Sequence, residues 1–131
     1  MITHIHHLNF VVNDLDVSIA YFSKLLATVP TLETLPERKV KTARYQVGQT
    51  YLVLVEPTTT NGVVAEILQN KGEGIFLLSF ATESIDEALL RLEIAYKNKR
   101  SGLDGWSISD LSPCEEFGAI LQLTEAVKPV A

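Results

Sequence analysis

The sequence repeats itself at an offset of about 70 residues, and this repeat limits the folds that it can adopt. A shift of 69 places residues 50–56 (TYLVLVE) on residues 119–125 (AILQLTE). A second stretch of the chain superimposes at a shift of 70, as the pairs at the end of this paragraph show. Because the shifts of 69 and 70 are nearly equal, both halves carry the same elements in the same order. The sequence therefore predicts two similar modules. A shift of 70 places Leu8 on Leu78, Phe10 on Phe80, Leu15 on Ile85, Asp16 on Asp86 and Ile19 on Leu89.

The first half of the repeat predicts a strand, a helix and a hairpin. Residues 5–12 alternate and are rich in β-branched side chains, which is typical of a strand. Asp14 is a good N-cap for a helix over 15–26, where apolar residues recur at helical spacing. Residues 40–47 and 50–55 flank the turn Gly48-Gln49 and predict an antiparallel hairpin.

The second half repeats this order after a short connecting helix. We expect that helix over 63–70, then a strand at 75–81, a helix at 85–95 and strands at 106–111 and 118–124. The expected fold is α+β, with two βαβββ modules forming one curved mixed sheet around a cleft. The 131 residues then make one domain. Its parts are module one at about 4–57, a linker helix at about 62–71 and module two at about 74–126.

Composition excludes several classes of protein. A net charge of -5 argues against a nucleic-acid partner, and no apolar run reaches the roughly 20 residues of a membrane span. The single cysteine, Cys114, precludes an internal disulfide and is consistent with a reducing, cytoplasmic location. The three histidines are His4, His6 and His7. Strand alternation predicts that His4 and His6 point away from the face that carries His7.

Four stretches resemble the vicinal-oxygen-chelate superfamily, which includes glyoxalase I, bleomycin-resistance proteins and extradiol dioxygenases. They are residues 7–16 (HLNFVVNDLD), 35–37 (LPE), 54–57 (LVEP) and 64–75 (VAEILQNKGEGI). The last is the most specific, because it is similar to the linker helix of methylmalonyl-CoA epimerases and the Gly-Glu-Gly that follows it. The resemblance covers nearly the whole chain and is weakest between residues 97 and 116. It implies a glyoxalase-like fold and a homodimer.

Enzymes of this superfamily hold a divalent metal with four side chains, and the resemblance implies that this site has lost donors here. The matching positions are His7, Val53, Leu77 and Gln122. Val53 and Leu77 have no donor atom, and Gln122 replaces a glutamate. We therefore expect no metal cofactor, although water could complete a weak divalent-metal site. Gln122 also cannot transfer a proton. The other proton-transfer carboxylate of the family matches Glu37, with Glu33 close enough to compete.

Each candidate residue has a plainer alternative role. His7 is either a hydrogen-bonded histidine left from a lost metal site or a surviving ligand or base. Gln122 is either satisfied by backbone or water, or it binds a ligand. Glu37 also fits a solvated loop, and acidic neighbours make Cys114 a poor nucleophile. The basic residues could meet coenzyme A phosphates or simply be solvated. They are Arg38, Lys39, Lys41, Arg44, Lys97, Lys99 and Arg100.

The resemblance and the substitutions together predict a glyoxalase/bleomycin resistance-like domain that binds a small organic or acyl-CoA-type ligand without the usual metal chemistry. Its catalytic candidate is Glu37. The alternative is a divalent-metal-dependent epimerase or lyase acting on an acyl-CoA or related thioester, with donors recruited from Glu73 or a partner chain. A third alternative is an interaction domain with a filled cleft. The expected ligand-binding residues are His7, Asn9, Tyr51, Val53, Leu77 and Gln122.

Overall fold

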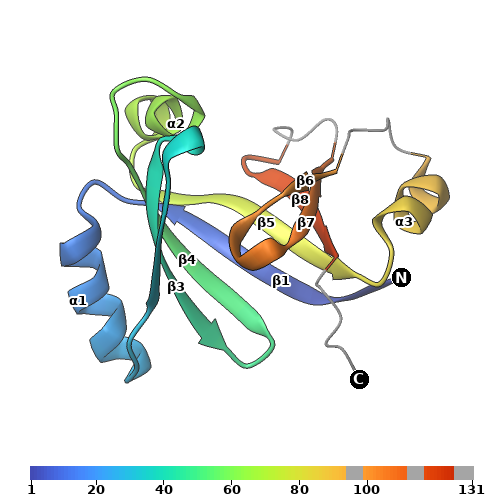
Figure 1. Ribbon diagram of the computed structural model, residues 1–131, viewed down its shortest axis with the longest axis horizontal. Helices are drawn as coiled ribbons and strands as arrows, with labels where there is room; N and C mark the ends of the chain where they lie inside the picture. The colour runs from blue at the N-terminus through green and yellow to red at the C-terminus, as the bar shows by residue number, and fades with distance from the viewer. Residues whose placement is uncertain (94–98, 112–116, 126–131) are drawn as a thin grey trace. The chain divides into compact units, whose positions relative to one another are not determined.

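Strands and helices alternate in the computed structural model in the order that the repeat predicts (Figure 1). The structure describes residues 1–93, 99–111 and 117–125. The series β1-α1-β2-β3-β4 and β5-α3-β6-β7-β8 are both βαβββ, which confirms the α+β prediction. The elements are β1 (Ile2–Val11), α1 (Leu15–Leu26), β2 (Thr31–Leu35), the 3-10 turn η1 (Pro36–Arg38), β3 (Val40–Val47), β4 (Thr50–Pro57), α2 (Val63–Lys71), β5 (Gly74–Thr82), α3 (Ile85–Leu92), β6 (Arg100–Ser101), the 3-10 turn η2 (Leu103–Gly105), β7 (Ser107–Asp110) and β8 (Ile120–Glu125).

The described residues divide into two compact units. Residues 8–76 form the first, which we call the N-unit. Residues 1–7, together with the described residues from 77 onward, form the second, the C-unit. The boundary falls inside β1, so His7 belongs to the C-unit whereas Asn9, two residues later, belongs to the N-unit.

The N-unit has the strand order β2-β3-β4-β1, and both β2–β3 and β3–β4 are antiparallel. Helix α1 packs on the sheet through Ile19, Phe22 and Leu26, at the helical spacing seen in the sequence. The Tyr45 hydroxyl reaches the helix as well, 2.8 Å from Ser23 Oγ. This apolar core is therefore built as the pattern predicts. Its buried members are Val12, Leu15, Ala43, Tyr45 and Leu54.

The C-unit has the strand order β1-β5-β8-β7-β6 and a mixed sheet. Strands β5 and β8 are parallel, whereas β8–β7 and β7–β6 are antiparallel. Helix α3 covers one face, where Ile85, Ala88, Leu89 and Leu123 form the core. The other face of β5 and β8 carries buried polar residues, because Ser79, Gln122 and Thr124 alternate with the core positions.

The first turn of α1 is held by its own N-cap and by a side chain from strand β4. Asp14 caps the helix, as predicted, by accepting a hydrogen bond from the Val17 backbone N–H at 3.1 Å. The backbone N–H of Leu15 donates to Glu56 Oε1 on β4 at 2.7 Å. A carboxylate at a helix N-terminus satisfies a free N–H group and opposes the positive end of the helix dipole.

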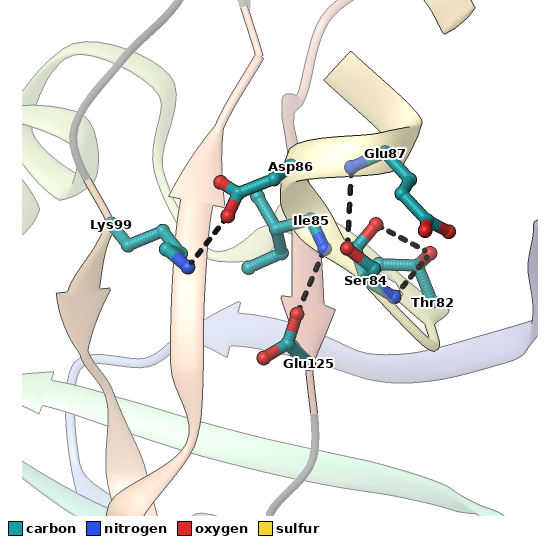
Figure 2. Close-up of polar contacts among 7 residues, drawn as sticks. All are labelled: Thr82, Ser84, Ile85, Asp86, Glu87, Lys99 and Glu125. Atoms are coloured by element: carbon teal, nitrogen blue, oxygen red, sulfur yellow. Dashed lines mark hydrogen bonds and ion pairs between the residues drawn. The ribbon is translucent and has the colours of Figure 1, made fainter. Parts of the chain in front are cut away.

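The start of α3 repeats these contacts in the C-unit (Figure 2). Ser84 accepts from the Glu87 backbone N–H at 3.2 Å, and Ile85 N–H donates to Glu125 Oε1 on β8 at 2.9 Å. Offsets of 70 and 69 residues relate Leu15 to Ile85 and Glu56 to Glu125. The repeat therefore extends from apolar pattern to individual hydrogen bonds.

Two strands were not predicted, because their residues carry no strand pattern. Strand β2 is an edge strand whose residues are mostly exposed, and β6 has only two residues. Neither shows the alternation of apolar and polar residues that marks a half-buried strand. Strand β4 also runs through Pro57 instead of ending before it. The predicted helix over 85–95 ends at Leu92, and residues 94–98 lie outside the described part of the chain.

Candidate functional site

His7 is buried in the C-unit, with 4% of its surface exposed. Its Nδ1 atom lies 2.9 Å from Nδ1 of His6, so one ring donates a hydrogen bond and the other accepts it. Burial, then the neighbouring His6, lowers the pKa of His7 from 6.5 to about 3. Burial, then His4, lowers the pKa of His6 to about 4. Both imidazoles are therefore neutral near pH 7.

The contact between these two rings corrects the prediction that His6 points away from His7. Alternation along the strand fixes only the direction of each Cα–Cβ bond. Both rings then turn toward Trp106, which stacks on His7 with centroids 4.9 Å apart and meets the His6 ring edge-on at 4.4 Å. The three rings form a buried cluster that the pattern of β1 alone does not reveal.

Trp106 is the site residue that sequence reasoning missed. It follows η2 directly, and this turn holds its backbone. The Trp106 N–H donates to Leu103 O at 2.9 Å, and its carbonyl accepts from Gly102 N–H at 2.7 Å. Trp106 is the single tryptophan of the chain, but it lies in the region where the family resemblance is weakest. The one signal in the sequence that could have pointed to Trp106 is that it is the single tryptophan of the chain.

Gln122 lies on β8 with 1% of its surface exposed, and only one end of its amide is satisfied. Its Nε2 donates to Asp110 Oδ1 on β7 at 3.0 Å. Asp110 in turn accepts from both terminal nitrogens of Arg100, at 3.0 and 3.5 Å. Gln122 Oε1 is buried without a hydrogen-bond partner of good geometry, although the amide is close enough to His7 to limit the fall of its pKa.

Leu77 lies on the same face of β5 as Ser79, which is opposite Gln122 in the β5–β8 register. Ser79 Oγ is 2.5 Å from Thr124 Oγ1, so these two hydroxyls satisfy each other. The C-unit therefore holds His7, Leu77 and Gln122 of the predicted site. On the neighbouring strands β7 and β6, the charges of Asp110 and Arg100 pair with each other.

The other predicted site residues belong to the N-unit. Asn9 Oδ1 on β1 is buried and has no hydrogen-bond partner among the described residues. Tyr51 and Val53 share one face of β4, and Val53 is fully buried. The Arg44 guanidinium lies 5.6 Å from the centre of the Tyr51 ring. Glu37 lies exposed in η1, between β2 and β3.

Several of the seven basic residues that the sequence analysis considers for coenzyme A phosphates have carboxylate partners. The ion pairs are Lys41–Glu56, Arg44–Glu33, Lys99–Asp86 and Arg100–Asp110, and Figure 2 shows the third of them.

Cys114 and Lys97 lie outside the described residues. Within the described ranges, no three side chains of the His, Cys, Asp or Glu types lie close enough together to hold a metal ion. No helix among those ranges is long and apolar enough to cross a bilayer.

We expect the stability of the protein to fall as the pH drops from 6.5 toward 4. In the unfolded chain these histidines take up protons near pH 6.5, whereas the folded pKa values of His6 and His7 are lowered to about 4 and about 3. A lowered pKa in the folded state means that stability is retained above pH 6.5 and lost on acidification. Melting temperatures followed by Trp106 fluorescence between pH 8 and 4 measure this effect.

The His7→Gln variant should show a flatter pH profile, because it removes one of the two buried titrating groups. His4→Gln is the comparison variant, because it removes only the smaller of the two causes that lower the pKa of His6, and it should change the acid slope less than His7→Gln does. An acid slope that is unchanged in His7→Gln and lost in His4→Gln contradicts the prediction.

Comparison with known proteins identifies relatives over most of the chain. A family model described as the Glyoxalase/Bleomycin resistance protein/Dioxygenase superfamily matches residues 6–102. The uncharacterized protein YqjC of Bacillus subtilis (strain 168) is 33% identical over 98 residues, which are 71% of this chain and 70% of YqjC.

Solved structures extend the likeness to the fold. A variant of Streptomyces coelicolor methylmalonyl-CoA epimerase in complex with 2-nitronate-propionyl-CoA has a TM-score of 0.83 at 26% identity, covering 95% of this chain and 94% of its own. The Mycobacterium tuberculosis methylmalonyl-CoA epimerase has a TM-score of 0.84 at 23% identity, covering 97% and 90%. The predicted resemblance to this superfamily and to methylmalonyl-CoA epimerase is confirmed.

Proposed function

The chain belongs to the Glyoxalase/Bleomycin resistance protein/Dioxygenase superfamily, and from this premise we propose that it binds a small organic or acyl-CoA-type ligand without the metal chemistry of its relatives. The complex of the Streptomyces coelicolor epimerase with 2-nitronate-propionyl-CoA supports the acyl-CoA class of ligand. We further propose a homodimer, by the same resemblance, and a cytoplasmic location, which the single cysteine favours.

The observation that carries the proposal is the bonding of Gln122. Its Nε2 donates to Asp110, and the amide offers only a neutral oxygen to anything bound beside it. A divalent metal needs several nitrogen or oxygen donors and a negative charge to offset its own. Of the four positions matched to metal ligands, only His7 and Gln122 have donor atoms, and neither is charged near pH 7. These residues do not fit a divalent metal.

The uncharged acceptors and apolar side chains at the predicted site positions suit a neutral ligand group. Gln122 Oε1 is a buried acceptor that has no hydrogen-bond partner of good geometry among the described residues, and a ligand N–H or O–H would satisfy it. Asn9 Oδ1 is a second such acceptor in the N-unit. Leu77 adds apolar surface in the C-unit, and Val53 does so in the N-unit. Within the C-unit, a ligand with an uncharged polar head and an apolar body therefore matches Gln122 and Leu77 better than a dicarboxylate does.

Proton transfer of the epimerase kind is disfavoured in this proposal. Gln122 replaces the glutamate that family members use there, and an amide neither gives nor takes a proton in the accessible pH range. Glu37 is the remaining candidate, exposed in η1. One carboxylate can remove a proton, but epimerisation also needs a group that returns one from the other face.

The alternative is a divalent-metal-dependent epimerase or lyase that acts on a thioester. The buried, unpartnered Gln122 Oε1 favours it, because a cation could also satisfy this oxygen. Elemental analysis of the purified protein, before and after incubation with Mn²⁺, Co²⁺ or Zn²⁺, distinguishes the two functions. We expect less than stoichiometric metal and no rise in melting temperature with any of the three ions.

A parallel thermal-shift titration tests the ligand class with coenzyme A, acetyl-CoA and methylmalonyl-CoA. A ligand present at about 100 times its Kd stabilises the folded state by about 2.7 kcal/mol, which is a readily measured shift. Leu77→Asp should abolish the shift, and Leu90→Asp, on the exposed side of α3, should keep it. Stoichiometric metal that is lost in His7→Ala and kept in His4→Ala would overturn the proposal in favour of the alternative.

A further inference from the structure

Asp110 fixes the direction of the hydrogen bonds that reach Gln122. It lies directly opposite Gln122 in the β7–β8 register, and both residues belong to the C-unit. The two oxygens of its carboxylate lie 3.0 and 3.5 Å from the terminal nitrogens of Arg100. A carboxylate only accepts hydrogen bonds, and a guanidinium only donates them. Whatever bonds to this ion pair on the Asp110 side must therefore be a donor.

The amide of Gln122 takes its orientation from Asp110. The two ends of an amide have nearly the same shape, but one end donates and the other accepts. Only Nε2 can bond to the carboxylate, and it lies 3.0 Å from Asp110 Oδ1. Oε1 is left at the opposite end of the amide, buried and without a hydrogen-bond partner of good geometry among the described residues. Asp110 thus decides which atom of Gln122 remains for the rest of the site.

The next group in this chain of polar contacts is His7. Burial and then His6 lower the pKa of His7, and Gln122 opposes them, as a nearby hydrogen-bond acceptor does. The Nδ1 atom of His7 is already 2.9 Å from Nδ1 of His6, which leaves Nε2 as the nitrogen for a second partner. A neutral imidazole carries one hydrogen. With that hydrogen on Nε2, directed at Gln122, Nδ1 becomes the acceptor for His6.

The surroundings of His7 keep its ring from exchanging the two nitrogens. The indole of Trp106 stacks on the imidazole, with centroids 4.9 Å apart and 25° between the planes. A half-turn of the imidazole about its Cβ–Cγ bond would have to pass through the indole. It would also replace the Nδ1 contact with His6 by a carbon atom. The position of the hydrogen, and not the position of the ring, therefore responds to the partners of His7.

We propose that Asp110 is a positioning residue that acts through the Gln122 amide to hold the hydrogen of neutral His7 on Nε2. The C-unit then offers a ligand one donor, His7 Nε2–H, and one acceptor, Gln122 Oε1. A carboxamide or a hydroxyl group satisfies both atoms. A ketone or a carboxylate satisfies only His7 and leaves the buried oxygen against a second acceptor. This choice of ligand group rests on the proposed function, whereas the role of Asp110 does not.

The position of this hydrogen also decides between the two roles that the sequence leaves open for His7. A neutral imidazole binds a metal ion or takes up a proton through the nitrogen that carries no hydrogen. On His7 that nitrogen is Nδ1, which accepts from His6. His7 is therefore a hydrogen-bond donor to the site, and the residue that makes it so lies on β7, where the family resemblance is weakest.

NMR of the imidazole nitrogens tests the role of Asp110 without any ligand. Long-range ¹H–¹⁵N correlation spectra show which nitrogen carries the hydrogen, and loss of signals in His7→Gln identifies His7. Wild-type protein near pH 7 should carry it on Nε2. In Asp110→Asn, Arg100 should hold the oxygen of the substituted side chain and leave its NH₂ group to Gln122. The Gln122 amide then turns over, and the His7 hydrogen should move to Nδ1.

Asp86→Asn is the matched control, because it makes the same change in the ion pair with Lys99, which also lies in the C-unit. It should leave the His7 hydrogen on Nε2. Far-UV circular dichroism shows that each variant is folded. A hydrogen on Nδ1 in wild-type protein, or on Nε2 in folded Asp110→Asn, overturns the proposal. The wild-type spectrum decides the position of the hydrogen even where Asp110→Asn does not fold.

Three small molecules of similar shape test the ligand group by NMR titration: isobutyramide, 3-methylbutan-2-one and isobutyrate. Only the amide has both a donor and an acceptor. We expect it to bind about 10-fold more tightly than the ketone, since the ketone leaves Gln122 Oε1 unpaired. Isobutyrate should bind most weakly, because its charge would be buried. Gln122→Met should bring the amide and the ketone to within about 2-fold of each other, and Leu90→Met, at an exposed position on α3, should keep the preference.

The two experiments separate failure of this inference from failure of the proposed function. Equal binding of the amide and the ketone to wild-type protein, or tighter binding of isobutyrate, overturns the choice of ligand group. Absence of binding by all three molecules, with the His7 hydrogen on Nε2, counts against the proposed function and leaves the role of Asp110 supported by the spectra.

Discussion

Replacing Gln122 by glutamate, the residue that its relatives are expected to use there, should destabilise this protein by about 3 kcal/mol at pH 7. The side-chain nitrogen of Gln122 donates to Asp110 Oδ1 at 3.0 Å, and a glutamate would place a second carboxylate against the first. With 1% of the residue exposed, water cannot solvate the added charge. Urea denaturation followed by circular dichroism measures the loss in the free energy of unfolding.

Two further variants separate charge from a lost hydrogen bond. Gln122→Met removes the amide without adding a charge and should cost about 1 kcal/mol. Adding Asp110→Asn to Gln122→Glu reverses the donor and the acceptor and should recover only the part of the loss due to repulsion, because the carboxylate at position 122 stays buried. The ion pair of Asp110 with Arg100 is partly exposed, so its removal adds little. Gln122→Glu protein as stable as wild type would contradict the hydrogen bonding described for Asp110.

The same double variant bears on function. It supplies a carboxylate at position 122 without the repulsion from Asp110, which is one of the donors that a metal site lacks in this chain. Leu77 and Val53 still contribute no donor atom. We therefore expect any gain in divalent-metal affinity to be small, as elemental analysis of the double variant would show.

Local pattern was enough to predict most of the fold. The helix over 15–26 and its Asp14 cap agree with the structure because the apolar spacing and the capping residue depend on the adjacent sequence alone. Strands β3 and β4 agree for the same reason, with a glycine turn between alternating runs. Strand β2 escaped prediction because an exposed edge strand needs no apolar alternation.

The candidate site was less predictable, because its contacts join residues that are distant in the sequence. His7 and Gln122 could be selected by their match to a family, but the partners of Gln122 could not. Asp110 meets Gln122 through the β7–β8 register, and Trp106 meets His7 through the turn η2. Neither residue belongs to a motif, and both fall where the family resemblance is weakest. Register and turn geometry are properties of the folded chain.

Truncating Leu123 to alanine should lower the free energy of unfolding by about 3 kcal/mol. Leu123 follows Gln122 on β8 but points to the opposite face, where it is 1% exposed against Ile85, Ala88 and Leu89. Truncation leaves a cavity between β8 and α3 that neighbouring side chains fill only in part. The melting temperature should fall by on the order of 10 °C.

The repeat again provides a matched variant, since an offset of 69 places Leu54 on Leu123. Leu54 is fully buried beneath α1 in the N-unit, so Leu54→Ala should cost a similar free energy. Leu90→Ala, at an exposed position on α3, should change stability by less than about 0.5 kcal/mol. Trp106 fluorescence reports on the C-unit alone, whereas circular dichroism reports on all strands and helices. A Leu123→Ala protein whose Trp106 transition matches that of wild type would contradict the packing of α3 on β8.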